Sequence, residues 1–448
     1  MVCPPLTGLL TLLPITAAPR SSFPRRTAEN NQLCPNCLRF ATGIARGLWI
    51  TPACERTFIP SDTPRTRAWN RPPNQAVQKS MTTSTSDNLV GPADLIAALP
   101  GILGFYPHES TILLGLCSDS EGPLDSVTLG PVLRADLTHT PQLLSVAGEL
   151  AAQECFAFYA VIVTRIPEST IVGETQALLF DATSATGLHL VDACWHVSEI
   201  ATGTPYSLMF GPGRQFSGSG ELSENFFRGS VSSVMSSPAM GALREDGSLP
   251  ELDRDHTFTY FDPAPADQPY AVEDRVALAR VAQTRSLALE RLLDLGEPGG
   301  EVAVEHAREL LRSAPPGPLI RSDRRFDPEA LPEEDDQLAV ATLLCTSKLR
   351  DLLISTAVDN PLPAGAALLR ISKTFPGVIR ANALCIWAFI AAERGLASWA
   401  TAAAAAALRE VPEHTMSCYF IWLMRSGNVS TMLQAAKDGV GAHWEPKK

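Results

Sequence analysis

Residues 94–116 read DLIAALPGILGFYPHESTILLGL, and this stretch decides the fold. Apolar side chains recur at three- and four-residue spacing over residues 95–103, which predicts a short helix. Pro100 interrupts that spacing, so we expect a kink or two helical pieces. Gly104 suits the left-handed turn that ends a helix, and residues 111–116 are a continuous apolar run of strand length. A strand that is apolar on both faces is typical of a sheet covered by helices on both sides.

The segments that follow alternate between strand and helix patterns. Three further strands are predicted at residues 126–133, 156–164 and 188–197, and two helices at residues 141–154 and 169–182. Pro131 indicates an edge position or a bulge in the second strand, because proline cannot donate to the ladder. The order β-β-α-β-α-β predicts a mixed α/β domain.

The second half of the chain has a helical character. Residues 202–269 are rich in loops, with one helix expected near residues 230–243. Further helices are predicted at residues 271–295, 301–314, 333–358, 363–375, 378–394, 396–410 and 416–425. The run Pro315–Pro318 is a strong break, which we interpret as an internal linker.

Charge is unevenly distributed along the 448 residues. Residues 1–80 hold ten Lys or Arg against three Asp or Glu, together with eleven prolines. With +7 in this segment and −12 overall, the remaining residues carry −19. A proline-rich segment without hydrophobic periodicity is typical of disorder. We therefore expect residues 1–87 to be a disordered or mis-assigned extension, and we predict Met81 as the natural start.

The acidic balance argues against anionic partners. A nucleic-acid binder needs a basic face to neutralise phosphates, and an anionic membrane surface attracts the same basic charge. No uncharged apolar run reaches the roughly eighteen residues of a transmembrane helix. Residues 6–15 are apolar, but no Lys or Arg precedes them as in a secretory signal. We expect a cytoplasmic protein that binds neither nucleic acid nor membranes.

The residues around the first strand carry a family resemblance. Leu103, Gly104, Phe105, Pro107 and Ser110 form a Leu-Gly-Phe-x-Pro-x-x-Ser turn, and Arg134, Asp136 and Leu137 form an Arg-x-Asp-Leu strand end. From residue 88 to the C-terminus the chain resembles an uncharacterised actinobacterial family, domain of unknown function 4192. The resemblance implies an apolar helix, this turn, an apolar strand and a second strand. It implies no known activity.

A second resemblance lies near the C-terminus, where residues 381–414 are similar to one tetratricopeptide unit. Gly395 matches the turn glycine, Ala400 and Ala407 match the small packing positions, and Pro412 matches the closing proline. A lone unit cannot bury both its faces, so neighbouring helices must cover it. We therefore predict four parts: an extension (1–87), a mixed α/β domain (88–262), a helical connector (263–330) and a helical, tetratricopeptide-like domain (331–448).

Two motifs that suggest a metal or a cofactor are incomplete. Cys34 and Cys37 have zinc-knuckle spacing, but four thiolates would require the irregularly placed Cys3 and Cys54. Residues 211–220, GPGRQFSGSG, lack the Gly-Lys-Ser/Thr element of a phosphate loop. We predict neither a metal site nor a cofactor, and we interpret the isolated cysteines as small buried residues in a reducing compartment.

Two groups near the turn are candidates for chemistry. His108, Glu109 and Ser110 are consecutive, but neighbours in a turn point in different directions, so a solvated pair beside a turn-bonded serine is the alternative to a catalytic relay. Arg134 and Asp136 share one face of a strand, either as a structural ion pair or as a ligand-binding pair at the sheet end. No catalytic residue is assigned. The ligand-binding candidates are Gly104, Phe105, Pro107, His108, Ser110, Arg134 and Asp136.

The missing catalytic motifs and the repeat-like helices lead to one main hypothesis. It is a non-enzymatic interaction or regulatory module that binds a protein partner through its helical half. The alternative is an enzyme or small-ligand-binding protein that uses the α/β domain near residues 104–110. The sequence indicates neither the partner nor the oligomeric state.

Overall fold

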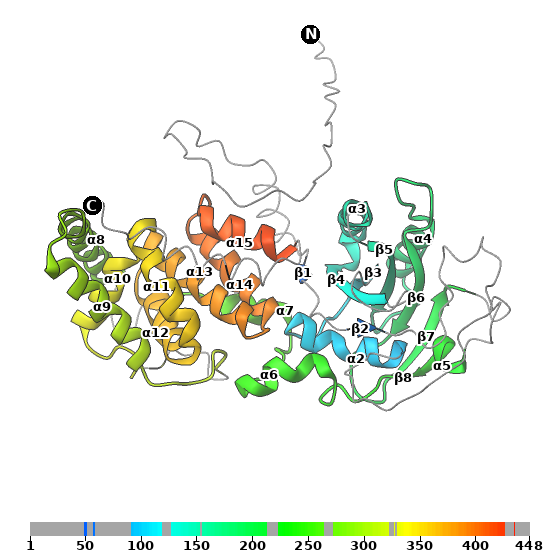
Figure 1. Ribbon diagram of the computed structural model, residues 1–448. Helices are drawn as coiled ribbons and strands as arrows, with labels where there is room; N and C mark the ends of the chain where they lie inside the picture. Colours follow the sequence, from blue (N-terminus) through cyan, green and yellow to red (C-terminus); the bar gives the residue numbers. More distant parts are fainter. Residues whose placement is uncertain are drawn as a thin grey trace, which may run out of the picture.

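The computed structural model describes residues 49–51, 57–58, 91–118, 127–152, 155–212, 223–263, 272–321, 327, 329–425 and 434. A sheet with flanking helices forms one half of the molecule, and an array of helices forms the other (Figure 1). The mixed α/β class followed by a helical region is therefore as the sequence predicted.

Eight described strands form one mixed sheet in the order β1-β4-β3-β5-β6-β7-β8, and β2 also pairs with β4. The pair β5–β6 is parallel, and the other pairs are antiparallel. The strands are β1 (Trp49–Thr51), β2 (Thr57–Phe58), β3 (Ser110–Ser118), β4 (Val127–Asp136), β5 (Cys155–Val163), β6 (Val191–Val197), β7 (Pro205–Phe210) and β8 (Arg228–Ser230).

Strand β3 lies inside the sheet, between β4 and β5, as its two apolar faces predicted. Leu113 belongs to the core on one face, and Ile112 and Leu114 belong to the core on the other. The β3–β4 register shifts between Leu114 and Leu116, opposite Pro131. Of the two alternatives predicted for Pro131, an edge position or a bulge, the structure has the bulge, and the register break removes the need for a donor there.

Helices cover both faces of this sheet. Helices α3 (Thr140–Ala151) and α4 (Thr170–Asp181) supply Leu143 and Leu179 to the core on one face. Helix α2 (Pro92–Leu103) lies on the other face, where one hydrophobic core continues into the helical array. The predicted order β-β-α-β-α-β is confirmed.

Helix α2 runs through Pro100 as one element, so the predicted alternative of two helical pieces is wrong, whereas the alternative of a kink stays a prediction. Leu99 and Leu103, on either side of the proline, are both fully buried. That burial offsets the hydrogen bond that Pro100 does not donate. Gly104 ends the helix with φ 75°, as predicted.

Residues 202–269 hold more structure than the sequence indicated. The helix expected near residues 230–243 is wrong in extent, because its first part lies outside helices. The observed elements are β7, β8 and the short helices α5 (Glu224–Phe227), η3 (Pro238–Met240), α6 (Gly241–Asp246) and α7 (Arg254–Thr259). Of the glycine-rich segment 211–220, which was not predicted to be a phosphate loop, residues 213–220 lie outside the described residues.

The helical array follows the predicted segments closely. The single helix predicted over residues 333–358 is two helices, because Thr346 accepts a hydrogen bond from the amide of Leu349 and starts a new helix. The array comprises α8 (Val272–Asp294), α9 (Pro298–Ser313), α10 (Glu334–Leu343), α11 (Ser347–Asp359), α12 (Pro361–Thr374), α13 (Gly377–Glu393), α14 (Ala397–Glu410) and α15 (Thr415–Arg425). None of the described helices is long and apolar enough to cross a membrane.

Successive helices of the array pack against each other, from α8 at one end to α14 beside the sheet (Figure 1). Helices α13 and α14 form the predicted helix-turn-helix, with Gly395 in the left-handed region between them. Ala400 and Ala407 are fully buried, and α13 is buried from Ile379 to Ala392. The tetratricopeptide assignment itself stays a prediction.

The structure adds observations on two parts of the predicted domain organisation, the N-terminal extension and the internal linker. Strands β1 and β2 come from the segment predicted to be an extension, and both pair with β4. The start at Met81 stays a prediction. Helices α9 and α10, on either side of the predicted linker, pack against each other.

Candidate functional site

The predicted turn lies where the sheet meets the helical array. A Cβ atom on Gly104 would lie 2.5 Å from the Oγ atom of Ser398, which belongs to α14. The amide of Tyr106 donates to the carbonyl of Glu251 at 2.9 Å, and the amide of Glu251 donates to the carbonyl of Gly104 at 2.9 Å. Phe105 and Pro107 are buried. This part of the turn therefore contacts protein rather than solvent.

Arg134 binds the second part of the turn, residues 108–110. Its Nε donates to the Oγ of Ser110 at 2.9 Å, and its Nη2 lies 2.7 Å from a carboxylate oxygen of Asp136. Nη2 also lies 3.4 Å from the carbonyl oxygen of His108. The guanidinium sits 5.8 Å from the ring centroid of Phe105. The predicted ion pair is thus formed, and it holds the turn; its ligand-binding role stays a prediction.

Burial distinguishes the two partners of that ion pair. The side chain of Arg134 is 5 % exposed, whereas that of Asp136 is 45 % exposed. Desolvation lowers the pKa of Arg134, and the carboxylate of Asp136 opposes that shift. Arg254, from α7, lies close enough to Asp136 that the carboxylate also opposes the fall in the pKa of Arg254 caused by burial. One half-exposed carboxylate thus interacts with two arginines.

His108, Glu109 and Ser110 do not form a relay. The hydroxyl of Ser110 donates to the carbonyl of His108 at 2.5 Å, and the imidazole of His108 contacts the carbonyl of Leu252 at 3.2 Å. Glu109 has φ 42°, and its carboxylate accepts a hydrogen bond from the hydroxyl of Thr164 at 2.8 Å. A base, a nucleophile and an orienting group are therefore not aligned here.

Several neighbours at this edge of the sheet were missed by the sequence analysis. Thr164 follows β5, and its carbonyl contacts the ring of His196 at 2.9 Å. Arg165 forms an ion pair with Glu199 beside it. The carboxyl ends of the parallel strands β5 and β6 meet at this edge, which is where α/β sheets commonly bind ligands. In the sequence, only this general rule about the carboxyl ends of parallel strands could have indicated these residues.

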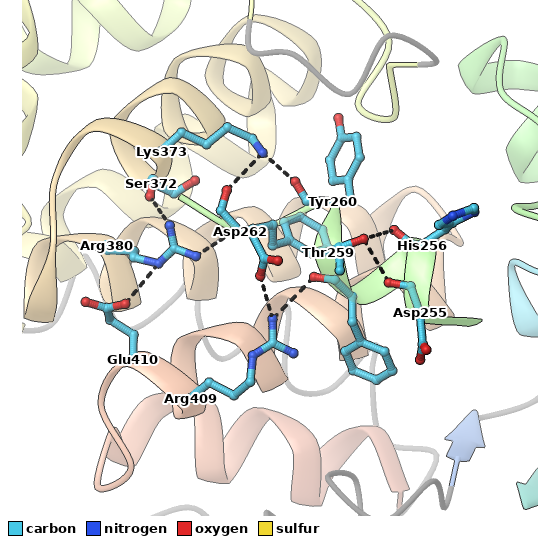
Figure 2. Close-up of polar contacts among 12 residues, drawn as sticks. Asp255, His256, Thr259, Tyr260, Asp262, Ser372, Lys373, Arg380, Arg409 and Glu410 are labelled. Carbon is cyan, nitrogen blue, oxygen red and sulfur yellow. Dashed lines mark hydrogen bonds and ion pairs between the residues drawn. The ribbon is translucent and has the colours of Figure 1, made fainter. Parts of the chain in front are cut away.

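A second polar cluster joins the sheet half to the array at the end of α7 (Figure 2). The Nζ of Lys373 donates to the carbonyls of Tyr260 at 2.5 Å and Asp262 at 3.2 Å. Arg380 donates to the carbonyls of Phe261 and Ser372. Cations at the carbonyl end of a helix are favourable, because the helix dipole is negative there.

Two carboxylates complete this cluster. The Nε of Arg380 lies 3.2 Å from a carboxylate oxygen of Glu410, whose other oxygen accepts a hydrogen bond from the amide of Gly377. Arg409 lies 3.3 Å from a carboxylate oxygen of Asp262. Burial lowers the pKa of Arg380, and Glu410 opposes that fall. The cluster is a structural joint, since its cations bind backbone carbonyls and these two carboxylates.

A third cluster has the residue types of a hydrolase triad. His414 contacts the hydroxyl of Ser417 through Nδ1 at 2.7 Å and the amide oxygen of Asn382 through Nε2 at 2.8 Å. Arg350 also donates to that oxygen, at 2.8 Å. Burial lowers the pKa of His414 to about 4, and Ser417 is fully buried. Because no substrate reaches a fully buried hydroxyl, this cluster stabilises the packing of α13 against α15.

Metal ligands do not gather in the part of the chain that the structure describes, where no three His, Cys, Asp or Glu side chains could hold an ion. Cys34 and Cys37 lie outside that part. When the sequence is compared with known protein families, the family described as Domain of unknown function (DUF4192) matches residues 92–424. The chain belongs to this family. Neither a curated protein nor a solved structure matches it.

Proposed function

We propose that this protein is a non-enzymatic cytoplasmic interaction module that binds a protein partner through its helical array. One observation carries the proposal: α8, the helix at the free end of the array (Figure 1), has several large apolar side chains exposed on its outer side. The large exposed apolar side chains on and after this helix are Val276, Val281, Leu287, Leu292 and Leu295.

These side chains occupy one side of α8. At 3.6 residues per turn, Val276, Val281, Leu287 and Leu292 fall within an arc of about 160°. The buried positions, such as Ala279, Ala282 and Leu289, fall on the opposite side and face the array. Leu287 is 59 % exposed and Leu295 is 76 % exposed, so neither is a partly covered core residue. The outer side of the helix is therefore mixed, because these apolar side chains flank the exposed polar residues Arg280, Thr284 and Arg291.

A helical array normally ends in a polar outer face, because an exposed apolar end would aggregate. Single exposed apolar residues are common on protein surfaces, but a cluster on one helix marks an interaction site. We infer that a second protein packs a helix on the outer face of α8 and so continues the array. This surface lies before residue 331, whereas the sequence pointed to residues 331–448, whose central helices α13 and α14 are buried.

The site at the sheet edge supports the non-enzymatic interpretation. Arg134 is bonded to the turn and to Asp136, and no base is aligned with a hydroxyl there. The alternative is a small-ligand site at the same edge. The half-exposed carboxylate of Asp136 favours it, because Asp136 ends β4 and interacts with two arginines at the sheet edge where β5 and β6 also end.

The test uses the tagged full chain, purified gently from its own host and measured by native mass spectrometry. Leu287→Glu/Leu292→Glu places two charges on the outer face of α8. Leu178→Glu/Leu188→Glu is the matched control, since it makes the same change at exposed leucines of the sheet half. We expect the unchanged chain and the control to retain the same protein partner, and the α8 variant to lose it.

Equal retention of that partner by both variants would contradict the α8 surface. The small-ligand alternative predicts a different pattern: a stoichiometric small-molecule adduct that both leucine variants keep and that His108→Ala/Asp136→Asn loses. This pair of changes leaves Arg134 in place.

A further inference from the structure

Two cysteines face each other across neighbouring strands of the sheet. Cys117 in β3 and Cys155 in β5 are partners in the antiparallel register, and their sulfur atoms lie 3.2 Å apart. Both are thiols. Directly opposed residues of antiparallel strands have Cα atoms about 4.5–5.5 Å apart, which lies within the span of a disulfide. The pair is therefore placed for an S–S bond without rearrangement of the strands.

A β-bulge creates this pairing. Leu116 pairs with Ala157, so an unbroken ladder would place Cys117 opposite Phe156. The register shifts between Leu116 and Cys117, and Cys155 becomes the partner instead. Bulges re-aim side chains, and this one turns both sulfur atoms toward the core beneath α3.

Two glycines make room for the sulfur atoms. A Cβ on Gly115 would lie 2.9 Å from the Sγ of Cys155, and a Cβ on Gly130 would collide with the Sγ of Cys117. Neither glycine has a positive φ, so the backbone conformation does not require glycine there. The space that the two thiols occupy does require it.

The two thiols differ in access. Cys117 is partly exposed, whereas Cys155 is 2 % exposed. A small oxidant in solvent can therefore reach Cys117 first, with Cys155 held behind it in contact. This is the arrangement of a reactive thiol beside a resolving thiol.

We propose that Cys117 and Cys155 are an oxidisable dithiol, a modification site for hydrogen peroxide, which closes to an intrachain disulfide. The sulfur of Cys117 attacks one peroxide oxygen; an S–O bond forms, the O–O bond breaks, and one water leaves. The sulfur of Cys155 then attacks the sulfenic acid; the S–S bond forms, the S–O bond breaks, and a second water leaves. Two thiols lose two protons and two electrons, and one peroxide becomes two waters.

The disulfide would join β3 to β5 and close a loop that contains β4 and α3, since its two cysteines are 38 positions apart. Closing a loop of this length constrains the unfolded chain, so we expect the oxidised protein to melt roughly 5 °C or more above the reduced protein.

The test treats the reduced full chain with hydrogen peroxide, alkylates the remaining thiols and maps the peptides without a reductant. We expect a peptide that links Cys117 to Cys155 and two fewer alkylated cysteines. Cys194 and Cys385 should stay alkylatable after denaturation, because burial raises the pKa of both thiols and both are fully buried. Dithiothreitol should remove the link.

Variants separate this pair from general oxidation. Cys155→Ser should leave Cys117 as a sulfenic acid that dimedone traps, while the matched Cys194→Ser should form the link normally. Gly130→Ala should slow disulfide formation at least tenfold by displacing the sulfur of Cys117. Peroxide treatment of the unchanged chain that yields no Cys117–Cys155 peptide would overturn the proposal; this measurement requires no variant to fold.

Discussion

Buried arginines hold the chain at two places, the turn at the sheet edge and the segment that follows helix α7, and the two contacts differ in origin. At the sheet edge, Arg134 is bonded to Ser110 and Asp136. At the array, Arg380 is bonded to Ser372, Phe261 and Glu410. Two positions separate Arg134 from its carboxylate, whereas Phe261 lies 119 positions before Arg380. The contact between Arg134 and Asp136 belongs to a local sequence pattern. The contact between Arg380 and Phe261 exists only because the fold brings distant parts of the chain together.

The two places also differ in solvation, and this difference predicts how much each arginine contributes to stability. Asp136 is half-exposed, so water can replace Arg134 as its partner. The carbonyls beside Arg380 are enclosed by α7 and the array, so their loss of a donor is not compensated. Four measurements test this difference.

Arg380→Met should give the largest effect. It removes the donor to two buried carbonyls and leaves Glu410 without its cation, which should lower the free energy of unfolding by about 4 kcal/mol. Denaturant unfolding measures the change. Arg409→Met is the matched control, because the half-exposed pair with Asp262 should contribute less than about 1 kcal/mol. Equal losses in the two variants would contradict the role of burial.

The second prediction extends the comparison to a buried histidine inside the array. Burial lowers the pKa of His414 to about 4, below the ordinary 6.5, so the unfolded chain binds more protons between these pH values. The stabilisation is complete above pH 6.5 and is lost as the pH falls toward 4, up to about 3 kcal/mol. Unfolding followed from pH 7 to 4 should show this slope, and His414→Gln should flatten it. An unchanged slope in the variant would exclude His414 as its source.

Arg134→Met should cost less than Arg380→Met, at about 2 kcal/mol, because the half-exposed Asp136 regains water while Ser110 loses its donor. Hydrogen exchange should rise in the turn at residues 104–110 and stay unchanged in α13. A cost equal to that of Arg380→Met would show that exposure of the remaining carboxylate does not matter.

Gly104→Ala tests the packing between the two halves. Alanine at φ 75° is strained, and its Cβ would crowd the Oγ of Ser398, so we expect a loss of about 1–2 kcal/mol. Adding Ser398→Gly should recover part of it. Gly173→Ala in α4 is the control, since a Cβ there meets nothing within 4 Å and should be neutral or stabilising. Equal losses at both glycines would refute the contact.

The sequence predicted most of the fold because its signals are local. The two apolar faces of β3 and the turn signal of Gly104 depend only on residues next to each other in the chain. The same logic allowed two helical pieces at Pro100, but the helix continues because burial of Leu99 and Leu103 outweighs a missing hydrogen bond. Local signals also missed β7, because this strand depends on its hydrogen bonds to β6 and β8.

The candidate site was predictable only in part. The spacing of Arg134 and Asp136 placed both on one face of β4, and the ion pair is present. Arg254 and Thr164 could not be found, because they reach the same edge from other elements.

The order of strands and helices, the left-handed turn at Gly104 and the family follow from the sequence alone, whereas the bulge at Pro131 was one of two alternatives. Tertiary structure alone decided which charges are buried, which sulfur atoms meet and which helix face stays uncovered. The physical reason is the separation along the chain over which each effect acts. Hydrophobic periodicity and turn chemistry act over a few residues. Pairing across the sheet and packing of the array join groups that lie dozens to more than a hundred positions apart.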